Sequence, residues 1–419
     1  MLRLLLLLSR GRKRRPCTAD VYFSYRLSVA DKHVAEDKAI NLDVVLQHFR
    51  LRLPVLQQKR HMVRGVPPSG LGYVCGTAVQ PGQCSVWGPD SSMRFALRSQ
   101  ATATSRMLFV FGDSYADTGN SPRTGNGWKF PYGETWPGSG TGRYSNGFVL
   151  TDILASEALH MPSPPPYAQL TVNSTLAGGI NFAVAGSGAG YAYGSPPFAT
   201  QVGWFATMVK AGYFQREALA RAVVLVSVAG NDYGAYNGST LQGYLALAHD
   251  VALKIDLGVR DLYSLGARNF MVSSLSPLAC TPARTFPSNY SACEKNVTVD
   301  EVVSTHNYLL GNRLKNITAN LNDTSIVYLQ QTAAMERVLK NPSLFNLTEG
   351  IRPCCVGLCS QMLAGVPLFS LCENPDQHMF WDNIHPTQAA WKAVVNLYMN
   401  DTAFTQFSPS LKEWLHTLP

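Results

Sequence analysis

The sequence predicts a three-layer α/β/α sandwich with a central parallel sheet, formed by residues 106–419. Two observations predict it. Short apolar runs rich in Val, Ile and Phe recur along the chain, and this composition is typical of strands buried on both faces of a sheet. Longer stretches with helical apolar spacing lie between these runs, and strands that alternate with helices build a parallel sheet covered on both sides.

The apolar runs define five candidate strands. Each is short and carries the β-branched or aromatic residues that buried strands prefer. They are residues 107–111, 180–184, 222–228, 269–275 and 325–329. We expect all five in one sheet, within a single domain.

Three helices follow from apolar spacing and end signals. Residues 148–159 repeat apolar side chains four apart, as one face of a helix does. Residues 241–265 form a long amphipathic stretch, and Gly266 follows it at the position where glycine commonly ends a helix. A last helix follows Pro386 and places aromatic and aliphatic side chains on one face.

A further helix is predicted to begin at Thr298. Thr298 and Glu301 have the spacing of a capping box, in which two side chains satisfy the first backbone N–H groups of a helix. His306 lies on the apolar stripe that follows. We therefore interpret His306 as a packing residue rather than a catalytic one.

Residues 1–105 are predicted to form a poorly ordered basic extension. Residues 1–106 contain 17 Lys and Arg against 6 Asp and Glu, whereas residues 107–419 contain 18 against 21. The formal net charge of +8 therefore belongs to the extension. Binding of nucleic acid needs a basic face on the folded domain, so we expect no nucleic-acid partner. Within the extension, residues 40–56 are compatible with a short helix.

The extension does not resemble a normal targeting segment. No uninterrupted apolar stretch approaches the ~20 residues of a transmembrane helix. The leucine run at residues 4–8 is shorter than the roughly 7–15 apolar residues of a signal peptide, and basic residues follow it instead of preceding it. A degenerate signal, a transit peptide and a misassigned start site all remain open.

Glycosylation sequons nevertheless favour the secretory route. Eight Asn-X-Ser/Thr sequences occur after residue 106 and none before it. Such sequences become glycans only in a secreted chain. The predicted sites are Asn173, Asn237, Asn289, Asn296, Asn316, Asn322, Asn346 and Asn400. We expect a secreted or extracellular glycoprotein.

Cysteine usage agrees with secretion. Six of the nine cysteines lie in the predicted domain: Cys280, Cys293, Cys354, Cys355, Cys359 and Cys372. An even number in a secreted domain predicts disulfides, but the pairing does not follow from spacing. Two of the six flank a Pro- and Ser-rich loop, and the other four precede residue 385. A metal site is a weaker interpretation, because the second group lacks the paired C-x-x-C spacing of zinc sites.

The candidate chemistry lies where predicted strands end. Ser114 follows the first strand, and the carboxyl ends of parallel strands form the crevice of an open α/β sheet. Gly186 follows the second strand and Asn231 the third, where a backbone N–H and a side-chain amide can hold a developing oxyanion. Asp382 and His385, three residues apart, can supply a base and the carboxylate that orients it. Taken singly, each has a plain structural alternative, namely a turn or a helix cap; four in this order indicate a serine hydrolase.

These segments resemble the GDSL esterase/lipase family of the SGNH hydrolase superfamily, and most closely its plant-type group. The resemblance rests on Phe-Gly-Asp-Ser at 111–114, Gly-Arg-Tyr-Ser-Asn-Gly at 142–147, Asn-Phe-Ala at 181–183, Gly-Asn-Asp at 230–232 and Trp-Asp-Asn-Ile-His-Pro-Thr at 381–387. It covers residue 107 to the C-terminus and implies a flavodoxin-like sandwich that hydrolyses carboxylic esters without a cofactor or metal.

The resemblance also implies roles for individual residues. Ser114 would be the nucleophile, His385 the general base and then acid, and Asp382 its orienter. The oxyanion donors would be the backbone N–H groups of Ser114 and Gly186 and the side chain of Asn231. Two neighbouring aspartates, Asp113 and Asp117, resemble residues that shape the turn and receive no catalytic role.

Three functions are alternatives to ester hydrolysis. An acyltransferase would use the same triad, and nothing in the sequence separates it from a hydrolase. A non-catalytic glycan- or lipid-binding relative is disfavoured by the complete set of candidate residues. Binding of NAD is rejected, because residues 186–190 read Gly-x-Gly-x-Gly rather than Gly-x-Gly-x-x-Gly and no acidic residue lies about 20 positions further on.

The sequence indicates an ester of a small molecule, a lipid or a polysaccharide as the substrate, without separating these classes. Two Gly-, Pro- and Ser-rich inserts, residues 121–145 and 186–197, are predicted to form the substrate rim. Their aromatic side chains suit an acyl chain, a phenolic acid or a sugar ring equally well. These are Trp128, Phe130, Tyr132, Trp136, Tyr144, Tyr191 and Tyr193.

Overall fold

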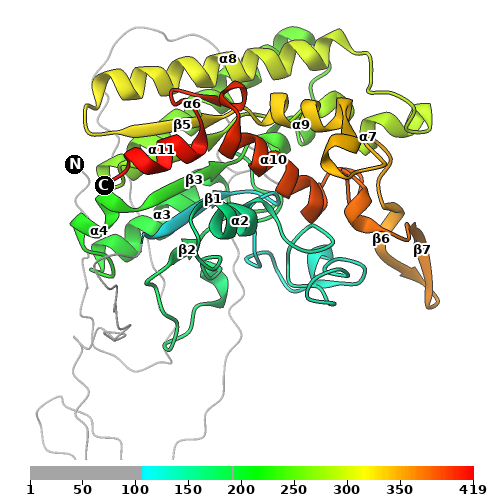
Figure 1. Ribbon diagram of the computed structural model, residues 1–419, viewed down its shortest axis with the longest axis horizontal. Coiled ribbons are helices and arrows are strands. Elements are labelled where there is room, and N and C mark those ends of the chain that lie inside the picture. The colour runs from blue at the N-terminus through cyan, green and yellow to red at the C-terminus, as the bar shows by residue number, and fades with distance from the viewer. Residues whose placement is uncertain (1–105, 191–192) are drawn as a thin grey trace, which may run out of the picture. The chain divides into compact units, whose positions relative to one another are not determined.

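The central sheet has five parallel strands and one short antiparallel strand. The computed structural model describes residues 106–190 and 193–419 (Figure 1). The predicted extension at residues 1–105, with its candidate helix at 40–56, lies outside these described residues. The parallel strands, in spatial order, are β2 (Gly179–Asn181), β1 (Leu108–Gly112), β3 (Val223–Ser227), β4 (Asn269–Ser273) and β5 (Ser325–Leu329). The edge strand β8 (Thr405–Gln406) pairs antiparallel with β5.

The predicted strands are confirmed, with one shift. Four of them lie within two residues of their predicted ends. The second was placed at residues 180–184, whereas β2 ends at Asn181. Beyond it the chain still follows β1, because Phe182 N–H donates to Val110 O and Val184 N–H to Gly112 O. The intervening N–H of Ala183, which points away from β1, donates to the side chain of Asn181 at 2.8 Å, just past the end of the regular strand.

Helices cover both faces of this sheet, as predicted. On one face lie α3 (Phe198–Lys210), α4 (Arg216–Arg221), α6 (Leu241–Ser264) and α8 (Val297–Asn320). On the other lie α2 (Leu150–Ile153), α9 (Gln331–Lys340), α10 (Gln388–Asn400) and α11 (Leu411–Thr417). Figure 1 shows α10 and α11 in front of the sheet. Two short helices, α5 (Gly230–Gly234) and α7 (Pro282–Thr285), follow β3 and β4 along the chain.

Alternating side chains of each strand feed two separate cores. In β1, Phe109 and Phe111 pack under α3 and α6, whereas Leu108 and Val110 pack under α10. All four are fully buried. Successive strand residues point to opposite faces, so a strand between two helical layers must be apolar throughout. This explains why these strands read as continuous apolar runs.

Two helix predictions need correction. Residues 148–159 do not form one regular helix, because α2 passes into a π-helical turn, η2 (Leu154–Ala158). The capping residue of α8 is Asn296 and not Thr298: the Asn296 side chain accepts Thr298 N–H at 3.1 Å, and the helix starts at Val297. Asparagine is the stronger N-cap, and it lies two residues earlier.

The other helix ends agree with the sequence. Helix α6 ends at Ser264, and Gly266 has a φ of +116°, a conformation that L side chains rarely adopt. Helix α10 is capped by Thr387, whose hydroxyl accepts Ala390 N–H at 3.1 Å. The remaining short helices are η1 (Asn126–Trp128), η3 (Tyr167–Gln169), η4 (Leu278–Cys280), η5 (Phe286–Ser288), η6 (Pro342–Phe345), η7 (Pro375–Gln377) and η8 (Thr402–Phe404).

A two-stranded hairpin extends from the sandwich. It consists of β6 (Cys355–Leu363) and β7 (Val366–Leu371) and lies at the right edge of Figure 1. The disulfide prediction is confirmed, and the structure supplies the pairing: Cys280–Cys293, Cys354–Cys372 and Cys355–Cys359. All six cysteines of the described residues are therefore bonded to one another, which contradicts the metal-site alternative.

The strand order places a crevice above β1. The chain passes from β1 to β2 on one side and then to β3 on the other, so β1 is the point where the order of strands reverses. Ligands of open α/β sheets bind outside the carboxyl ends of the strands at this point. The residue that follows β1 by two positions is Ser114. Among residues 106–190 and 193–419, no helix has the length and apolarity needed to cross a membrane.

Candidate active site

Ser114 lies at the bottom of this crevice, in the turn after β1. The turn is held to β3 by Asp113 N–H, which donates to Ser227 O at 3.1 Å, while the Asp113 carboxylate accepts Tyr115 N–H. A Cβ at Gly112 would meet Ser227 O at 2.2 Å, so the strand end requires glycine. The close approach of two backbones fixes where the serine emerges.

His385 contacts Ser114 although 271 positions separate them in the sequence. The Nε2 atom of His385 lies 2.8 Å from the Ser114 hydroxyl. On the other side of the ring, Nδ1 lies 2.9 and 2.8 Å from the two carboxylate oxygens of Asp382. The structure thus brings the three predicted residues into one hydrogen-bonded chain.

Asp382 is oriented by its own loop. One of its oxygens accepts the backbone N–H groups of Ile384 and His385, each at 2.8 Å. Burial alone would raise the pKa of Asp382, but the neighbouring His385 and these hydrogen bonds outweigh it and lower the pKa below its usual value. An ionised carboxylate favours a proton on Nδ1, which leaves Nε2 free to accept one.

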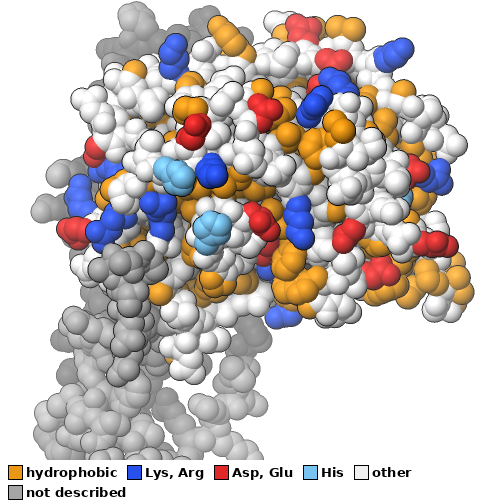
Figure 2. Space-filling model, viewed as in Figure 1, with side chains coloured by type: hydrophobic (Ala, Val, Ile, Leu, Met, Phe, Trp, Pro, Cys, Tyr) orange, Lys and Arg blue, Asp and Glu red, His pale blue; other side chains and the backbone are white. Residues whose placement is uncertain are grey.

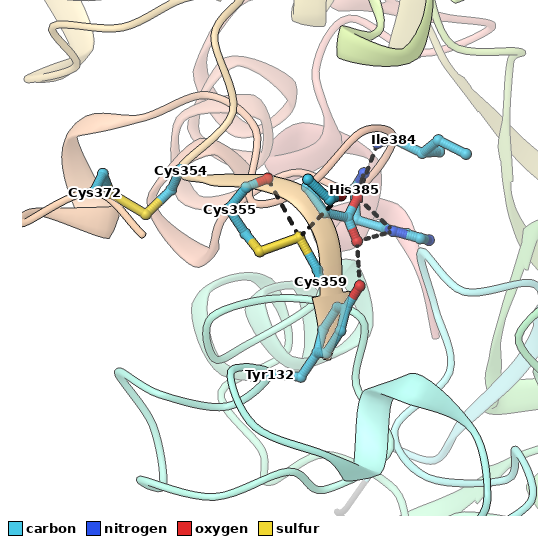
Figure 3. Close-up of a disulfide and its surroundings, with 9 residues drawn as sticks. Tyr132, Cys354, Cys355, Cys359, Cys372, Ile384 and His385 are labelled. Atoms are coloured by element: carbon cyan, nitrogen blue, oxygen red, sulfur yellow. Dashed lines mark hydrogen bonds and ion pairs between the residues drawn. A yellow bond between two sulfur atoms is a disulfide. The ribbon is translucent and has the colours of Figure 1, made fainter. Parts of the chain in front are cut away.

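Tyr132 is a site residue that sequence reasoning missed. Its hydroxyl donates to the second carboxylate oxygen of Asp382 at 2.7 Å (Figure 3). Burial, with the nearby Asp382, holds the pKa of Tyr132 well above its usual value, so the phenol stays protonated as a donor. The neighbouring Tyr144 contacts His385, with ring centroids 5.0 Å apart and the rings tilted by 39°. The sequence showed only two aromatic residues in an insert, with no signal for either role.

The three predicted oxyanion donors differ in their surroundings. Among the residues that the structure describes, the N–H groups of Ser114 and Gly186 donate to no protein acceptor. Gly186 has a φ of +83°, and a Cβ there would meet Ser195 Oγ at 2.7 Å. The side chain of Asn231, in contrast, donates to Ser187 O at 2.9 Å. The N–H groups of Ser114 and Gly186 are thus free to bind an oxyanion. The Asn231 amide is bonded to the carbonyl of Ser187, the residue after Gly186.

Asp117 shapes this region without touching the reacting groups. Its carboxylate accepts four backbone N–H groups, those of Gly119, Asn120, Ser121 and Ala185. The last of these immediately precedes Gly186. One buried side chain therefore joins the turn after β1 to the turn after β2, in agreement with the structural role that the sequence suggested.

A cavity of about 440 Å³ opens beside Ser114. Its lining combines apolar with hydroxyl and amide side chains, and it includes Asn231, Tyr233, Leu275 and Ile384. Gly186 is not among the lining residues. The contribution of residues 274–276 was missed, although they lie at the carboxyl end of the strand predicted at 269–275, next to β3, and so belong to the same sheet edge.

The predicted aromatic rim is largely wrong. Of the predicted aromatics, only Tyr193 lines the cavity, and Tyr191 lies outside the described residues. Tyr132 and Tyr144 contact residues 381–387, the loop that carries two of the candidate triad residues and is called the triad loop. Trp136 stacks on Phe148 with ring centroids 4.3 Å apart. Trp128 lies under the Arg123 guanidinium, and Phe130 is exposed. The insert at 121–145 supports the candidate catalytic residues more than it forms a rim.

One buried titratable group, Asp113, lines the cavity, and a second, His306, pairs with the lining residue Tyr233. Burial raises the pKa of Asp113 to about 7, although hydrogen bonds from the backbone of Tyr115 and Ala229 oppose the rise. Burial lowers the pKa of His306 to about 3, and its Nδ1 lies 2.7 Å from the hydroxyl of Tyr233. The packing role predicted for His306 is therefore confirmed, since it is fully buried and pairs with a cavity-lining tyrosine.

The sequence profile of the GDSL-like Lipase/Acylhydrolase family matches residues 108–397, a span that includes every residue of this site. The chain belongs to this family. Two GDSL esterase/lipases of Arabidopsis thaliana are similar to it: one is 35% identical over 69% of this chain and 85% of its own length, the other 34% identical over 70% and 93%.

Solved structures resemble this GDSL chain more distantly. A protein titled as a GDSL-like lipase of Parabacteroides merdae shares 12% identity over 71% of this chain and 95% of its own, with a TM-score of 0.32. A TM-score this low does not support an assignment of the fold. The family match and the observed sheet establish it instead. The GDSL family and its named relatives make this protein a carboxylic-ester hydrolase.

Proposed function

We propose that this hydrolase cleaves esters by serine catalysis, with Ser114 as nucleophile, His385 as general base and Asp382 as the orienter of the imidazole. The observation that carries the proposal is the continuous contact from hydroxyl to imidazole to carboxylate, at 2.8 and 2.8 Å. A serine hydroxyl is a weak nucleophile by itself and needs a base within this distance.

The reaction follows from these contacts in two acyl-transfer steps. Nε2 of His385 takes the Ser114 proton as the oxygen attacks the ester carbonyl, and the resulting imidazolium returns a proton to the leaving alcohol. Water, activated by the same imidazole, then attacks the acyl-enzyme and releases the acid. Asp382 stabilises the imidazolium in both steps, since it is ionised and bound to Nδ1.

The oxyanion is held by the N–H groups of Ser114 and Gly186 and by the Asn231 amide. Each well-aimed donor is worth about 3–4 kcal/mol of barrier in enzymes of this type. The two unpaired N–H groups support this assignment. The Asn231 amide completes the set by exchanging its bond to Ser187 O for one to the oxyanion.

Replacement of Ser114 tests the proposal. We expect Ser114→Ala to lose hydrolysis of p-nitrophenyl acetate by at least about 10³-fold, with an unchanged melting temperature. Ser276→Ala is the matched control, because Ser276 lines the same cavity. Near-normal turnover in Ser114→Ala, or equal losses in the two variants, would refute the role of Ser114.

We also propose that the protein is a secreted glycoprotein. Three disulfides support passage through an oxidising compartment. Seven of the eight sequons have an exposed asparagine. The eighth, Asn296, is half-buried, and its amide donates to Glu294 at 3.0 Å, so we expect no glycan there. Secreted protein should lose mass on treatment with an amidase specific for N-glycans; an unchanged mass contradicts the proposal.

A further inference from the structure

The tip of the β6–β7 hairpin exposes an unusual run of apolar side chains. Residues 361–368 are all exposed, and the two strands bear five large apolar residues that are 40–67% exposed: Leu358, Met362, Leu363, Val366 and Leu368. Phe130 of the neighbouring insert is exposed and contacts Phe369, with ring centroids 6.1 Å apart. Figure 2 shows hydrophobic side chains at the lower right, over β6 and β7. Contiguous exposed apolar surface of this kind marks a contact site.

The hairpin is also free of charge. Residues 353–372 contain no Asp, Glu, Lys, Arg or His, in a chain that is 15% charged. Solvent-exposed strands normally carry charged side chains, which keep them soluble and prevent association. An uncharged apolar tip favours an uncharged, apolar partner.

The geometry of the strands disfavours another protein as that partner. A protein chain would add to an open strand edge through backbone hydrogen bonds. Here the outer strand β7 carries Pro367, which has no N–H, and the pairing is irregular between Gly357 and Met362. Both features obstruct a further strand. A lipid surface needs no such pairing, because it accepts apolar side chains directly.

The root of the hairpin is firmly joined to the triad loop. The Cys354–Cys372 disulfide closes the hairpin, and Cys355–Cys359 ties β6 to itself (Figure 3). Backbone N–H groups of Cys354 and Cys355 donate to Phe380 O at 3.0 Å and to Trp381 O at 2.7 Å. The next residue is Asp382. A surface that holds the tip therefore holds the segment from which Asp382 and His385 project.

We propose that the β6–β7 hairpin docks this hydrolase on an uncharged lipid surface, through Leu358, Met362, Leu363, Val366, Leu368 and Phe130. Docking brings the triad loop to the surface where lipid esters are concentrated. The inference concerns binding and does not depend on which residue is the nucleophile.

Vesicle flotation tests the docking directly. The full chain carrying Ser114→Ala, which keeps the vesicles intact, is mixed with dioleoylphosphatidylcholine vesicles at low and high salt. We expect it to float with the vesicles at both salt concentrations, since no charge is involved. Adding Leu363→Asp should weaken partitioning at least about tenfold, because the free energy of burying one leucine side chain in an apolar phase corresponds to at least that factor in the partition constant.

The matched control is Leu344→Asp in η6, because Leu344 and Leu363 are 66% and 67% exposed. This variant should bind vesicles as its parent does. Absence of flotation by the parent, or equal weakening in both variants, overturns the proposal. So does a dimer, seen by light scattering, that Leu363→Asp dissociates, because the hairpin would then serve a second copy of the chain.

Activity separates this inference from the proposed mechanism. In a chain with Ser114 intact, Leu363→Asp should hydrolyse soluble p-nitrophenyl acetate normally but lose about tenfold on a long-chain ester embedded in the vesicles. An equal loss on both esters contradicts docking. If the wild-type chain floats but hydrolyses neither ester, the docking surface stands and the proposed function fails.

Discussion

At the scale of single residues, the Asp382 carboxylate contacts four polar groups. It accepts the backbone N–H groups of Ile384 and His385, faces Nδ1 of His385, and receives the Tyr132 hydroxyl. Removing a hydrogen bond to a charged group costs about 1.5–3 kcal/mol. Tyr132 is therefore a positioning residue that acts on the reacting atoms through Asp382.

Tyr132→Phe should lower kcat about tenfold and leave KM unchanged. The ring that packs on Trp381 remains, and only the donor to Asp382 is lost. Steady-state kinetics on a soluble p-nitrophenyl ester measure the split. Tyr144→Phe is the control, since that ring contacts His385 and not Asp382, and we expect nearly normal kcat. An effect on KM alone would show that Tyr132 is a packing residue instead.

Asp113 should make stability depend on pH in an unusual direction. Its folded pKa is about 7 against an ordinary 3.8, so the folded state binds the proton more tightly than the unfolded state. Stability from this group is complete below about pH 4 and is lost as pH rises through 7. The shift corresponds to roughly 4 kcal/mol at most.

Urea unfolding at pH 5 and pH 8 measures this term. The wild-type chain should lose stability between these values relative to Asp113→Asn, whose amide does not ionise and can still accept Tyr115 N–H. A difference between the two proteins that is the same at both pH values would show that Asp113 does not titrate in this range.

At the scale of elements, two disulfides brace different walls of the site. Cys354–Cys372 supports the backbone next to Asp382, whereas Cys280–Cys293 closes the loop containing α7, of which Ala283 and Arg284 line the cavity. The paired cysteines are 18 and 13 positions apart in the sequence, so each bridge is worth about 3 kcal/mol of stability by chain entropy. Their kinetic effects should differ.

Replacing Cys354 and Cys372 together by alanine should lower kcat, because the triad loop loses its support. Replacing Cys280 and Cys293 should chiefly raise KM, because a wall of the cavity loosens. Thermal unfolding and steady-state kinetics of both double variants give the comparison. Equal changes in kcat and KM for the two pairs would mean that the bridges stabilise only the whole domain.

Elements also show where the sequence was informative. The five parallel strands were predictable because both of their faces are buried, which leaves long apolar runs. The N-cap of α8 was misplaced because Thr298 matches a capping box while Asn296 is the residue that reaches the backbone. The β6–β7 hairpin was not predicted at all. Its exposed apolar residues break the alternation by which a half-buried strand is recognised.

At the scale of the whole molecule, folding brings together groups that are remote in the sequence. The motifs placed Ser114 after the first strand and His385 before the last helix, and these positions sufficed to predict the candidate triad. The cavity walls and the Tyr132 contact were not predictable, because they depend on which loops meet above the sheet. Such packing has no local signal, whereas a strand end does.

The central claim is that the contacts around Ser114 make its hydroxyl reactive. Its most direct measurement is peptide mass spectrometry after treatment with a fluorophosphonate, which labels only activated hydroxyls. We predict one adduct, on the peptide that contains Ser114, and labelling at least about 10²-fold slower in His385→Ala. An adduct on another residue, or an unlabelled chain that still hydrolyses esters, would contradict the account.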